Sequence, residues 1–486
     1  MENEIKLFIH GEHVNSSDNK TFDNINPVNQ SKLSKVHIAN QDDIEKAVNS
    51  SLEGFEEWSQ YSGTERSRVL LKAASILSKR NDELAKLETL DTGKAIQESL
   101  DVDIKLSADS FEYYAGLAPT ISGEHIYYKN SLSYSRREPL GVCAGIGAWN
   151  YPLQVASWKI APALACGNAV IFKPAELTPT TTAILGEILI EAGLPQGALN
   201  IVQGFGDTGS LLSKHPKIAK VSLTGEVTTG KQVMKDASST LKNITFELGG
   251  KSPLIIFEDA DIDNAVRAAM LGNFYTQGEI CTNCTRVFVH HSIKDKFLEE
   301  LVKKTKKLKL GDPMDPETQI GSLISLEHKE KVLSYINKGI SSGANLLIGG
   351  SKPFENKLDE GAFVRPTIFD QCTDDMNIVK DEIFGPVMSV LTFENEDEVI
   401  SRANDTIYGL AAGVFTKDLN RAHRVIGKLE SGICWINTYN YYPIEMPAGG
   451  FKQSGIGTEN GKETIHQYTR LKTVYLEMGD VESPYE

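Results

Sequence analysis

Five short apolar runs, beginning at residue 141, constrain the fold of this 486-residue chain more than any other feature. They are GVCAGIGAW, NAVIFKP, ALNIVQG, KVSLTG and NITFELGG, and most of the stretches between them are long enough for a helix. Strands alternating with helices are typical of a doubly wound, largely parallel α/β sheet, whose ligands bind beyond the carboxyl ends of the strands. We therefore expect functional side chains directly after these runs.

The rest of the chain differs in pattern on either side of this region. A second series of runs, PLIIFED, RVFVHH, GAFVRPTIF and GICWIN, predicts a second α/β domain. Before residue 141 the chain is helical, because DDIEKAVNSSLEGFEEWSQ and TERSRVLLKAASILSKRNDELAKLETLDTG carry apolar residues three and four positions apart. Gly93 is expected to cap the second of these helices.

Charge and composition narrow the class of partner. A formal net charge of -15 argues against a nucleic acid or an anionic membrane, which such a surface would repel. The first residues, MENEIKLFIHGEHV, lack a basic segment followed by an apolar run, and no window approaches the roughly 18 apolar residues of a membrane span. Six cysteines are too sparse for a disulfide framework. We expect a cytoplasmic protein with neither nucleic acid nor membrane as partner.

Three segments that follow predicted strands suit a nucleotide. GFGDTG at 204–209 matches G-x-G-x-x-G, with Glu226 about where a ribose-binding acid would stand, but a tight strand-to-helix turn is an equal alternative in a chain with 40 glycines. SLTGEVTTGK opens a helix whose free N–H groups suit a phosphate, or is an ordinary capped helix. Lys173 and Glu176 lie either beside a ribose or in a surface ion pair.

Cys281 and Cys284, in GEICTNCTR, form half of a metal or redox site, or else only one of them is reactive. A structural zinc site needs four ligands, whereas the other cysteines are isolated, and His290 and His291 are adjacent in an expected strand, where side chains alternate. A C-x-x-C redox motif is expected at the start of a helix after the first strand of a small domain, whereas Cys281 and Cys284 lie past the middle of a long chain. A single thiolate is therefore the favoured hypothesis.

A catalytic thiolate needs a base and donors for the oxyanion that it creates. Glu247 in FELGGKSP and Asn150 in GAWNYP follow predicted strands and suit these roles. If YPLQVASW is helical, Tyr151 and Trp158 are seven apart and share one face, and Tyr275 lies six before Cys281. Aromatic residues at such spacing are most often part of the core.

These segments together resemble a known family. FELGGKSP, Cys281 34 positions after Glu247, Arg286 five further on, and the motifs GAWNYP, KPAELTP, EIFGPV and GGFKQSGIG are similar to the aldehyde dehydrogenase superfamily over essentially the whole chain. More narrowly, LETLDTGKA, RREPLGVCAGIGAWNYP, ELGGKSPLIIFEDAD, LNRAHRV, SGICWINT and EMGDVES resemble bacterial betaine aldehyde dehydrogenases and the related 4-trimethylaminobutyraldehyde enzymes.

The resemblance implies an aldehyde dehydrogenase-like α/β fold with two doubly wound, Rossmann-like parallel-sheet domains and a small β element for oligomerisation. It places an NAD-binding domain at 1–119 and 141–248, a catalytic domain at 249–449 and the oligomerisation element at 120–140 and 466–486. A homo-oligomer, either a dimer or a tetramer built as a dimer of dimers, follows from it.

The resemblance also assigns site residues. A nucleophile, a general base, an oxyanion donor and two proton-relay residues correspond to Cys281, Glu247, Asn150, Lys159 and Glu459. Cofactor contacts correspond to Gly147, Ala148, Trp149, Lys173, Glu176, Gly225, Thr229, Gly249, Glu382 and Phe384. An aromatic box for a trimethylammonium group corresponds to Tyr151, Trp158 and Tyr275. Potassium sites correspond to main-chain groups near Asn24, Ile25, Asp91, Leu177, Leu241, Lys452 and Gly455. Cys284 stands where relatives often have Gly and is interpreted as a packing residue.

The implied activity is NAD-dependent oxidation of betaine aldehyde to glycine betaine, an osmoprotectant, through a thiohemiacetal and a thioester on the cysteine. Oxidation of 4-trimethylaminobutyraldehyde or other amino-aldehydes is the alternative substrate choice, and NADP the alternative cofactor. A cofactor-free thiol hydrolase is disfavoured, because it would have no use for the set Lys173, Glu176 and Glu382.

Three positions depart from the family pattern. Glu226 replaces the usual Ser or Gly beside the pyrophosphate, which a carboxylate repels unless it turns away or meets a cation. Thr458 stands where many relatives have Arg, and Ala448 where some have a further aromatic residue. Aromatic residues that could replace it are Tyr439, Tyr441 and Tyr442.

Overall fold

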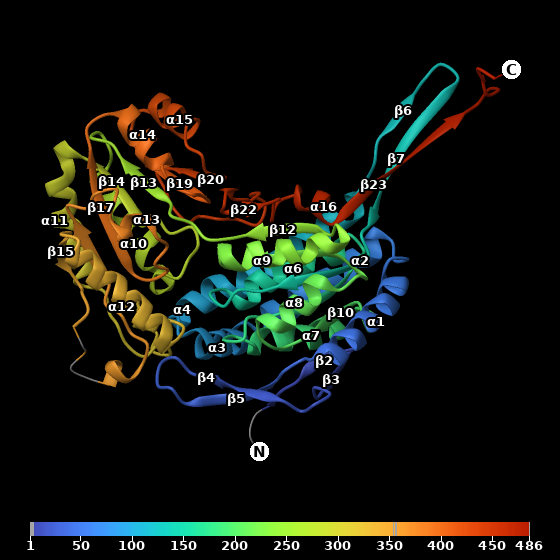
Figure 1. Ribbon diagram of the computed structural model, residues 1–486, viewed down its shortest axis with the longest axis horizontal. Coiled ribbons are helices and arrows are strands. Elements are labelled where there is room, and N and C mark those ends of the chain that lie inside the picture. Colours follow the sequence, from blue (N-terminus) through green and yellow to red (C-terminus); the bar gives the residue numbers. More distant parts are fainter. Residues whose placement is uncertain (1–3, 353, 355–356, 486) are drawn as a thin grey trace.

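The computed structural model describes residues 4–352, 354 and 357–485. Figure 1 shows two α/β bodies side by side and a thin β arm that projects from one of them. The predicted fold class is confirmed: the described residues form two large, largely parallel sheets and three small ones, one of which is the β arm. The predicted domain boundaries stay predictions, and residues 1–3, 353, 355–356 and 486 of those ranges lie outside the described part of the chain.

The first sheet has eight strands in the order β22-β12-β11-β8-β9-β10-β2-β3. The five predicted runs form its parallel centre, and short antiparallel strands flank it. The strands are β2 (Leu7–Ile9), β3 (Glu12–Val14), β8 (Val142–Ile146), β9 (Ala169–Lys173), β10 (Leu199–Ile201), β11 (Ile218–Thr224), β12 (Asn243–Glu247) and β22 (Gly455–Ile456). A small separate sheet contains β1 (Glu4–Ile5), β5 (Lys32–His37) and β4 (Thr21–Ile25).

Helices cover both faces of the first sheet and form its two apolar cores. One face carries α2 (Gly63–Lys79), α5 (Ile104–Leu117), α6 (Pro152–Ala165) and α7 (Thr180–Ala192). The other carries α1 (Gln41–Trp58), α8 (Gly206–Lys214) and α9 (Val227–Ala237). This sandwich leaves the carboxyl ends of the parallel strands as the place where polar side chains gather.

The predicted helix ending at Gly93 is in fact two helices. Arg80 leaves helical geometry between α2 and α3 (Asn81–Thr92), at φ −98° and ψ 15°. Its guanidinium binds Glu83 at 2.7 and 2.9 Å. The prediction was wrong here because both helices keep apolar residues at helical spacing, so periodicity does not mark the break. Gly93 is confirmed as the C-terminal cap, with φ +77°.

A π-helical turn interrupts the next helical segment. The short helix α4 (Ile96–Glu98) leads into a π-helical stretch at Ser99–Asp103, which continues as α5. Such bulges turn side chains away from the ordinary helical faces. Asp101 and Val102 of this stretch line the large cavity described below, whereas Ser99 and Asp103 are buried.

The second sheet has seven strands in the order β15-β16-β17-β14-β13-β19-β20, all parallel except the β15–β16 pair. They are β13 (Pro253–Ile256), β14 (Arg286–His290), β15 (Asn345–Ile348), β16 (Thr367–Asp370), β17 (Val387–Phe393), β19 (Ala411–Phe415) and β20 (Ile433–Ile436). Its helices are α10 (Ile262–Phe274), α11 (Lys294–Thr305), α12 (Leu326–Ser341), α13 (Asn377–Lys380), α14 (Glu396–Asn404) and α15 (Leu419–Ile426). The remaining short elements are β18 (Tyr408–Gly409), β21 (Phe451–Lys452) and α16 (Thr464–Gln467).

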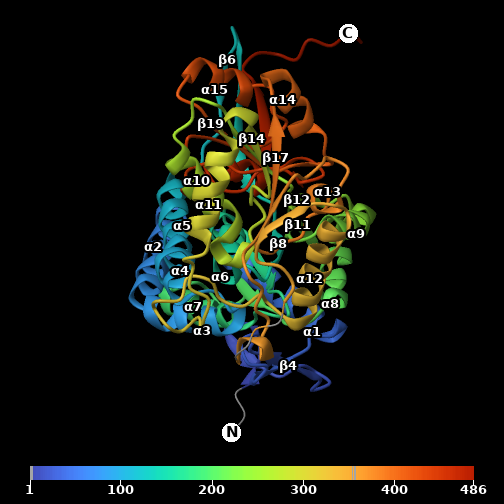
Figure 2. The same cartoon turned by 90° about the vertical axis from the view of Figure 1, so that its left-hand side faces the viewer.

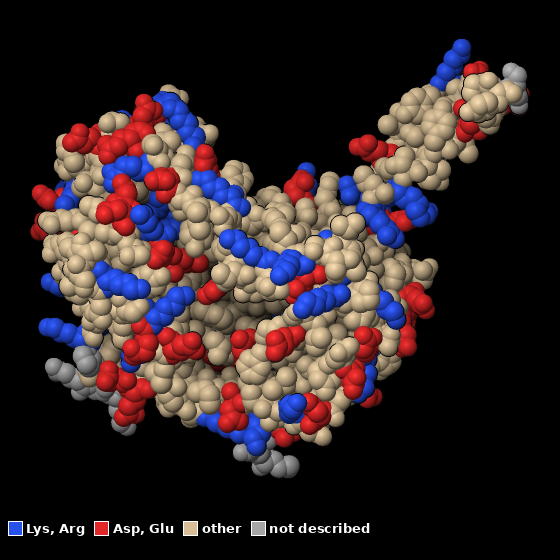
Figure 3. Space-filling view, in the orientation of Figure 1, with Lys and Arg blue, Asp and Glu red and all other residues tan. Residues whose placement is uncertain are grey.

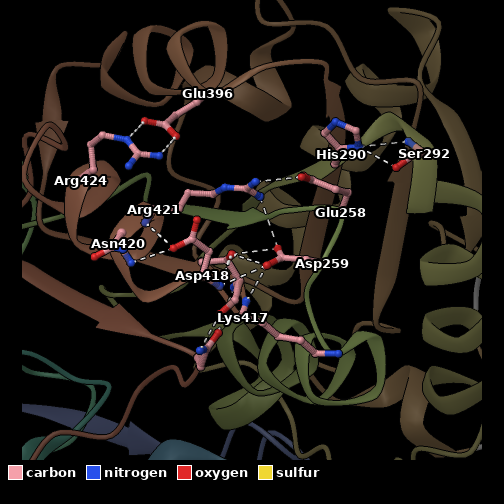
Figure 4. A network of polar contacts seen from close by, with 12 residues as sticks. Glu258, Asp259, His290, Ser292, Glu396, Lys417, Asp418, Asn420, Arg421 and Arg424 are labelled. Carbon is pink, nitrogen blue, oxygen red and sulfur yellow. Dashed lines mark hydrogen bonds and ion pairs between the residues drawn. The ribbon is translucent and has the colours of Figure 1, made fainter.

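A polar network fastens the outer end of this second sheet (Figure 4). Asp259, after β13, accepts hydrogen bonds from the Thr416 hydroxyl at 2.8 Å and the Lys417 backbone N–H at 2.9 Å. Arg421 of α15 pairs with Glu258 at 3.0 Å. His290 and His291 do not alternate along a strand as predicted: their rings lie 4.6 Å apart, because β14 ends at His290 and a 3₁₀ turn begins at His291.

The projecting arm is a three-stranded antiparallel sheet of β6 (His125–Tyr127), β7 (Ser131–Pro139) and β23 (Thr469–Glu477). Figure 1 shows it extending away from both bodies, and in Figure 2, where the second body lies in front of it, its tip rises above them. It exposes a row of large apolar side chains: Ile126, Tyr127, Tyr128, Tyr134, Leu471, Tyr475 and Leu476. Among the described residues, no helix combines the length and apolar character needed to cross a membrane.

Candidate active site

Loops from both large sheets enclose a cavity of about 1880 Å³. Figure 3 shows the molecule hollowed between its two bodies, with acidic and basic side chains around the hollow. Except for Lys159, every residue predicted for catalysis, cofactor or substrate lines this cavity. The catalytic group is Cys281, Glu247, Asn150 and Glu459; the cofactor group is Gly147, Ala148, Trp149, Lys173, Glu176, Gly225, Thr229, Gly249, Glu382 and Phe384; the substrate group is Tyr151, Trp158 and Tyr275.

The two cysteines lie in different environments. Cys281 is half-buried on the cavity wall, whereas Cys284 is fully buried and takes its place in the core of the second body. The Cys284 thiol lies 3.6 Å from the Gly272 carbonyl, and a Cβ on Gly272 would collide with its sulfur at 2.4 Å. Among the described residues, no group of three or more His, Cys, Asp or Glu side chains is arranged to hold a metal ion.

Acidic neighbours surround the Cys281 thiol. Burial, followed by the charges of Glu247 and Glu382, raises the pKa of this thiol to about 12. Glu247 ends β12 and is itself buried, and burial together with the charge of Glu459 raises its pKa well above the ordinary value. A carboxylate with a raised pKa is a stronger base, so Glu247 is suited to accept a proton from a thiol or a water.

The loop that carries Cys281 is held under strain by hydrogen bonds. Thr276 and Gln277 have φ of +49° and +41°, in the left-handed region that non-glycine residues avoid. The buried Glu98 carboxylate accepts the Thr276 backbone N–H at 3.1 Å and its hydroxyl at 3.0 Å. Asn150, after β8, donates its side-chain amide to the Glu279 carbonyl at 2.9 Å. A primary amide has two N–H groups, so Asn150 keeps one for another acceptor.

The residues predicted for the adenosine side lie after β9 and at the start of α9. Lys173 is buried; its ammonium group donates to the Pro174 carbonyl at 2.9 Å and lies 3.6 Å from the half-exposed Glu176 carboxylate. The hypothesis of a plain surface ion pair is therefore wrong for Lys173. Glu226 is the N-cap residue of α9 but caps no backbone N–H with its side chain. Its carboxylate points to Lys331 of α12, at 3.7 Å.

The G-x-G-x-x-G segment forms the turn between β10 and α8. Gly204 has φ +143°, and a Cβ there would lie 2.3 Å from the Thr208 hydroxyl. That hydroxyl donates to the Ala39 carbonyl at 3.0 Å. Gly206 and Gly209 line the cavity. This segment is therefore both a tight turn and part of the cavity wall.

An aromatic cluster closes the cavity on the side of the second sheet. The Trp149 ring lies edge-on to Phe384 at 5.1 Å and to His328 at 5.4 Å between centroids. The His328 Nε2 lies 2.6 Å from the Phe384 carbonyl, and burial lowers the pKa of His328 to about 4, so the neutral ring donates this bond. A Cβ on Gly249 would lie 2.0 Å from a Glu382 carboxylate oxygen, so only glycine leaves room for that carboxylate.

The predicted aromatic box is partly rearranged. Tyr151 is the residue before α6 rather than in it, so it does not share a helix face with Trp158. Trp158 instead packs edge-on against Tyr442, at 5.7 Å, and Tyr442 and Tyr275 complete the wall. Of the three tyrosines offered for the gap at Ala448, Tyr441 and Tyr442 line the cavity. Tyr439 is buried and donates to the Thr282 carbonyl at 2.7 Å.

A buried cation lies behind Tyr151. The Lys94 ammonium group sits 3.8 Å from the Tyr151 ring centroid and 2.8 Å from the Asp103 carboxylate, and neither Lys94 nor Asp103 is exposed. The Tyr151 hydroxyl binds Thr276 at 2.7 Å. One face of the Tyr151 ring is therefore already occupied by a cation of the protein itself.

Only part of the predicted potassium-site group comes together. The Asn24 amide donates to Asp91 at 2.8 Å, and Asp91 also accepts from the Thr180 backbone N–H at 2.9 Å. The Asn24 side-chain oxygen is buried without a hydrogen-bond partner in the described structure, which suits a hard cation. Leu241 precedes β12, whereas Gly455 pairs with Glu247 at the other end of that strand, so they are apart within one chain.

Several residues around the cavity were not predicted from the sequence. His328 and Lys331 are one turn apart on α12. The Glu279 carbonyl accepts the hydrogen bond from Asn150, and the Lys94 ammonium group lies over the Tyr151 ring. The spacing of apolar residues in α12 indicates which of its positions are buried, but not which element packs against it. No signal in a single sequence pairs these residues with their partners, which lie more than 50 positions away.

Known proteins share the sequence and the architecture of this chain. The aldehyde dehydrogenase family matches residues 13–474. A point mutant of betaine aldehyde dehydrogenase from Staphylococcus aureus, in complex with NAD+, is 41% identical, with 99% of each chain covered and a TM-score of 0.96. An NAD+ complex of aldehyde dehydrogenase from Bacillus cereus is 43% identical over 98% of this chain and 97% of that one, with a TM-score of 0.96.

A third structure is more distant in sequence but equally close in fold. The NAD-dependent aldehyde dehydrogenase from Sinorhizobium meliloti is 36% identical over 100% of this chain and 97% of that one, with a TM-score of 0.97. Family match, near-complete coverage and shared fold agree with the cavity and its residues. This chain belongs to the aldehyde dehydrogenase family.

Proposed function

We propose that this enzyme oxidises trimethylammonium aldehydes, with betaine aldehyde as the preferred substrate and NAD as the electron acceptor. The observation that carries the proposal is the joint lining of one cavity by Cys281, by the Lys173–Glu176 pair and by the Trp158–Tyr442 aromatic wall. Of the three similar structures named above, two are NAD+ complexes, and one of these two is a betaine aldehyde dehydrogenase.

The residues of the cavity fit a dinucleotide. Glu176 offers a half-exposed carboxylate to ribose hydroxyls, and the uncapped first turn of α9 offers backbone N–H groups to a diphosphate. Trp149, Glu382 and Phe384 form the opposite wall. A bound nicotinamide supplies the acceptor for the hydride that leaves the substrate carbon.

The protein residues account for the other steps. Cys281 adds to the aldehyde carbon as a thiolate, after the thiol, whose pKa is raised by burial, has given up its proton to water in the cavity. The remaining Asn150 N–H and the backbone N–H of Cys281 stabilise the oxyanion. After oxidation, Glu247 deprotonates a water that hydrolyses the thioester.

The charge of the cavity mouth supports a cationic substrate. Asp109, Glu112 and Glu445 line the cavity beside the aromatic wall. Burial raises the pKa of Asp109. Lys105 lowers this pKa, whereas the charges of Glu112 and Glu445 raise it further. These carboxylates are thus close enough to repel one another, a repulsion that a bound trimethylammonium group relieves. Aromatic faces attract the same group by cation–π interaction.

The alternative substrate is a longer one. 4-Trimethylaminobutyraldehyde carries the same cation on a longer chain, so it competes for the same aromatic and acidic groups. NADP is the alternative cofactor, disfavoured because Glu176 repels its additional phosphate.

Two further assignments belong to the same proposal. The apolar row on the β6–β7–β23 arm suits a contact with a second copy of the chain, since exposed apolar patches of this kind mark interfaces. Asn24 and Asp91 suit a potassium ion.

The test measures NADH formation from betaine aldehyde and from its uncharged isostere, 3,3-dimethylbutanal. We expect roughly tenfold or greater preference in kcat/KM for the charged substrate, because each aromatic face contributes about 0.5–2 kcal/mol. Trp158→Ala should remove most of that preference while small neutral aldehydes are still oxidised. Equal kcat/KM values for the two isosteres would refute the substrate assignment and leave the family activity untouched.

A further inference from the structure

The segment that leads to Cys281 leaves regular helical structure where α10 ends. Thr276 and Gln277 have φ of +49° and +41°, in the left-handed region, and Gly278 follows with φ +83°. A Cβ on Gly278 would lie 2.2 Å from the backbone of Gly385, so the segment turns directly against another loop. A β-branched residue such as threonine keeps this backbone conformation only where its surroundings impose it.

The Glu98 carboxylate, from the first body, holds Thr276 in this conformation. Glu98 is the last residue of α4, and its side chain is buried. One carboxylate oxygen accepts the Thr276 backbone N–H at 3.1 Å, and the other accepts the Thr276 hydroxyl at 3.0 Å. A carboxylate is an acceptor only, so it satisfies both donors of this one threonine.

Tyr151 extends the contact to the segment that follows β8. Its hydroxyl lies 2.7 Å from the Thr276 hydroxyl oxygen. The Thr276 hydroxyl has a single proton, which it donates to Glu98, so in its contact with Tyr151 it is the acceptor. The hydrogen bonds therefore run in one direction, from Tyr151 to Thr276 to Glu98. We call these three side chains the Glu98 network.

The proposed nucleophile and oxyanion donor are both chain neighbours of the Glu98 network. Asn150 directly precedes Tyr151, and Cys281 follows Thr276 in the same segment. The Thr276 carbonyl accepts the Glu279 backbone N–H at 2.8 Å, and the Glu279 carbonyl accepts the Asn150 amide at 2.9 Å. These contacts form a closed ring, so a displacement of Thr276 moves both groups relative to each other.

The surroundings of the Tyr151 ring favour this role over contact with a substrate cation. The Lys94 ammonium group already lies over one face of the ring, 3.8 Å from its centroid. A second cation on the opposite face would be repelled by the first across the ring. Asp103, 2.8 Å from Lys94, reduces this repulsion without freeing the occupied face. The Tyr151 hydroxyl is therefore the part of this side chain that has a defined partner.

We propose that Glu98 is a positioning residue for the attack on the aldehyde, an inference that rests on the proposed function. Through Thr276 and Tyr151 it fixes the Cys281 sulfur and the Asn150 amide relative to each other. Glu98 and Thr276 are buried behind the cavity wall, so they act through the residues that line it. A displacement of about 1 Å at reacting groups costs up to roughly 10²-fold in rate.

Tyr151→Phe is the sharpest test, because it removes the hydroxyl and keeps the aromatic ring. Rapid mixing of enzyme and NAD with aldehyde measures the rate of NADH formation in the first turnover. This rate should fall roughly 10–100-fold, by the same factor for betaine aldehyde and 3,3-dimethylbutanal, while the half-saturating aldehyde concentration stays unchanged. An unchanged rate, or a loss confined to the charged aldehyde, would overturn the inference and leave Tyr151 as part of the substrate wall.

Thr276→Val removes the linking hydroxyl and keeps a β-branched side chain of the same shape, so it should slow the first turnover by a similar factor. Thr276→Ser keeps the hydroxyl and should restore the wild-type rate. Thr416→Val is the matched control, because it also removes a buried hydroxyl that donates to a carboxylate, that of Asp259 at 2.8 Å (Figure 4). It lies at the outer end of the second sheet and should leave the rate unchanged.

Two substitutions of Glu98 distinguish hydrogen bonding from charge. Glu98→Leu removes both acceptors and should be as slow as Tyr151→Phe. Glu98→Gln still accepts the Thr276 N–H, and its amide can donate to the Thr276 hydroxyl, which then donates to Tyr151, so most of the rate should return. Equal loss in the two variants would overturn the positioning role, because charge alone would then matter. If Glu98→Leu does not fold, Tyr151→Phe and Thr276→Val still decide.

The outcome for the proposed function is read separately, from the wild-type enzyme. Equal kcat/KM for the charged and neutral aldehydes would refute the substrate assignment alone, since either aldehyde still reports the first turnover of each variant. Normal wild-type activity together with normal first-turnover rates in Tyr151→Phe and Thr276→Val would refute only the role of Glu98.

Discussion

The carboxylate of Glu226 should weaken NAD binding, and its removal is the most informative single change at the cofactor side of the cavity. Glu226 stands at the N-terminus of α9, where backbone N–H groups would meet a diphosphate, and its side chain is 71% exposed. Two unit charges about 4 Å apart interact by about 1 kcal/mol in water, and the interaction falls with distance and salt. Repulsion between Glu226 and the diphosphate is therefore about 1 kcal/mol, or roughly fivefold in Kd.

Lys331 offsets part of this repulsion. It lies 3.7 Å from Glu226, and exposed pairs of this kind contribute about 0–1 kcal/mol. Glu226→Gln, which keeps the shape and removes the charge, should tighten NAD binding by roughly twofold to fivefold. Lys331→Met should weaken it by a similar factor, because the carboxylate loses its neutralising cation.

The assay is isothermal titration of NAD into the substrate-free protein, which does not depend on turnover. The difference between wild type and Glu226→Gln should shrink at about 1 M salt, where the screening length falls to about 3 Å. Unchanged Kd in both Glu226→Gln and Lys331→Met would refute the electrostatic reasoning. A salt-independent difference would do the same, since it would point to a change of shape.

Three other changes test the remaining assignments. Cys281→Ala should abolish NADH formation while Cys284→Ala keeps most of it and chelators have no effect; comparable loss in both variants would restore the paired-cysteine hypothesis. Glu247→Gln should leave the NADH burst and slow steady turnover by roughly 10²–10⁴-fold, and an equal loss of the burst would place Glu247 before hydride transfer. NAD should be preferred over NADP, and Glu176→Gln should narrow that preference; equal kcat/KM for both cofactors in the wild type would show that Glu176 moves away.

The sequence was sufficient for the fold class because strand and helix periodicities are local. The five runs after residue 141 are the parallel strands of the first sheet, and the glycine at position 93 is a cap because only its own backbone has to become left-handed. The positions of Asn150 and Glu247 followed in the same way, since Asn150 follows β8 and Glu247 is the last residue of β12, and the carboxyl ends of both strands face the cavity. The resemblance then supplied the roles, which periodicity does not contain.

Predictions from local sequence patterns were wrong where contacts with other elements determine the backbone conformation. The helix that ends at Gly93 breaks at Arg80, and Tyr151 precedes its helix instead of sharing a face with Trp158. Apolar spacing is the same on either side of a break, so only backbone angles reveal it. In both cases the sequence predicted which residues are buried or line the site but not how they are oriented.

By itself, therefore, the sequence determined the order of strands and helices and the residue types that lie at the carboxyl ends of the strands of the first sheet. Only the tertiary structure decided which groups the charged side chains meet: Glu226 lies beside Lys331, and Lys94 lies over the Tyr151 ring. Strand and helix formation depends on spacings of two to four residues, whereas the energy of a charge depends on burial and on partners brought close by chain folding. The shifted pKa values of the buried groups belong to that second kind of information.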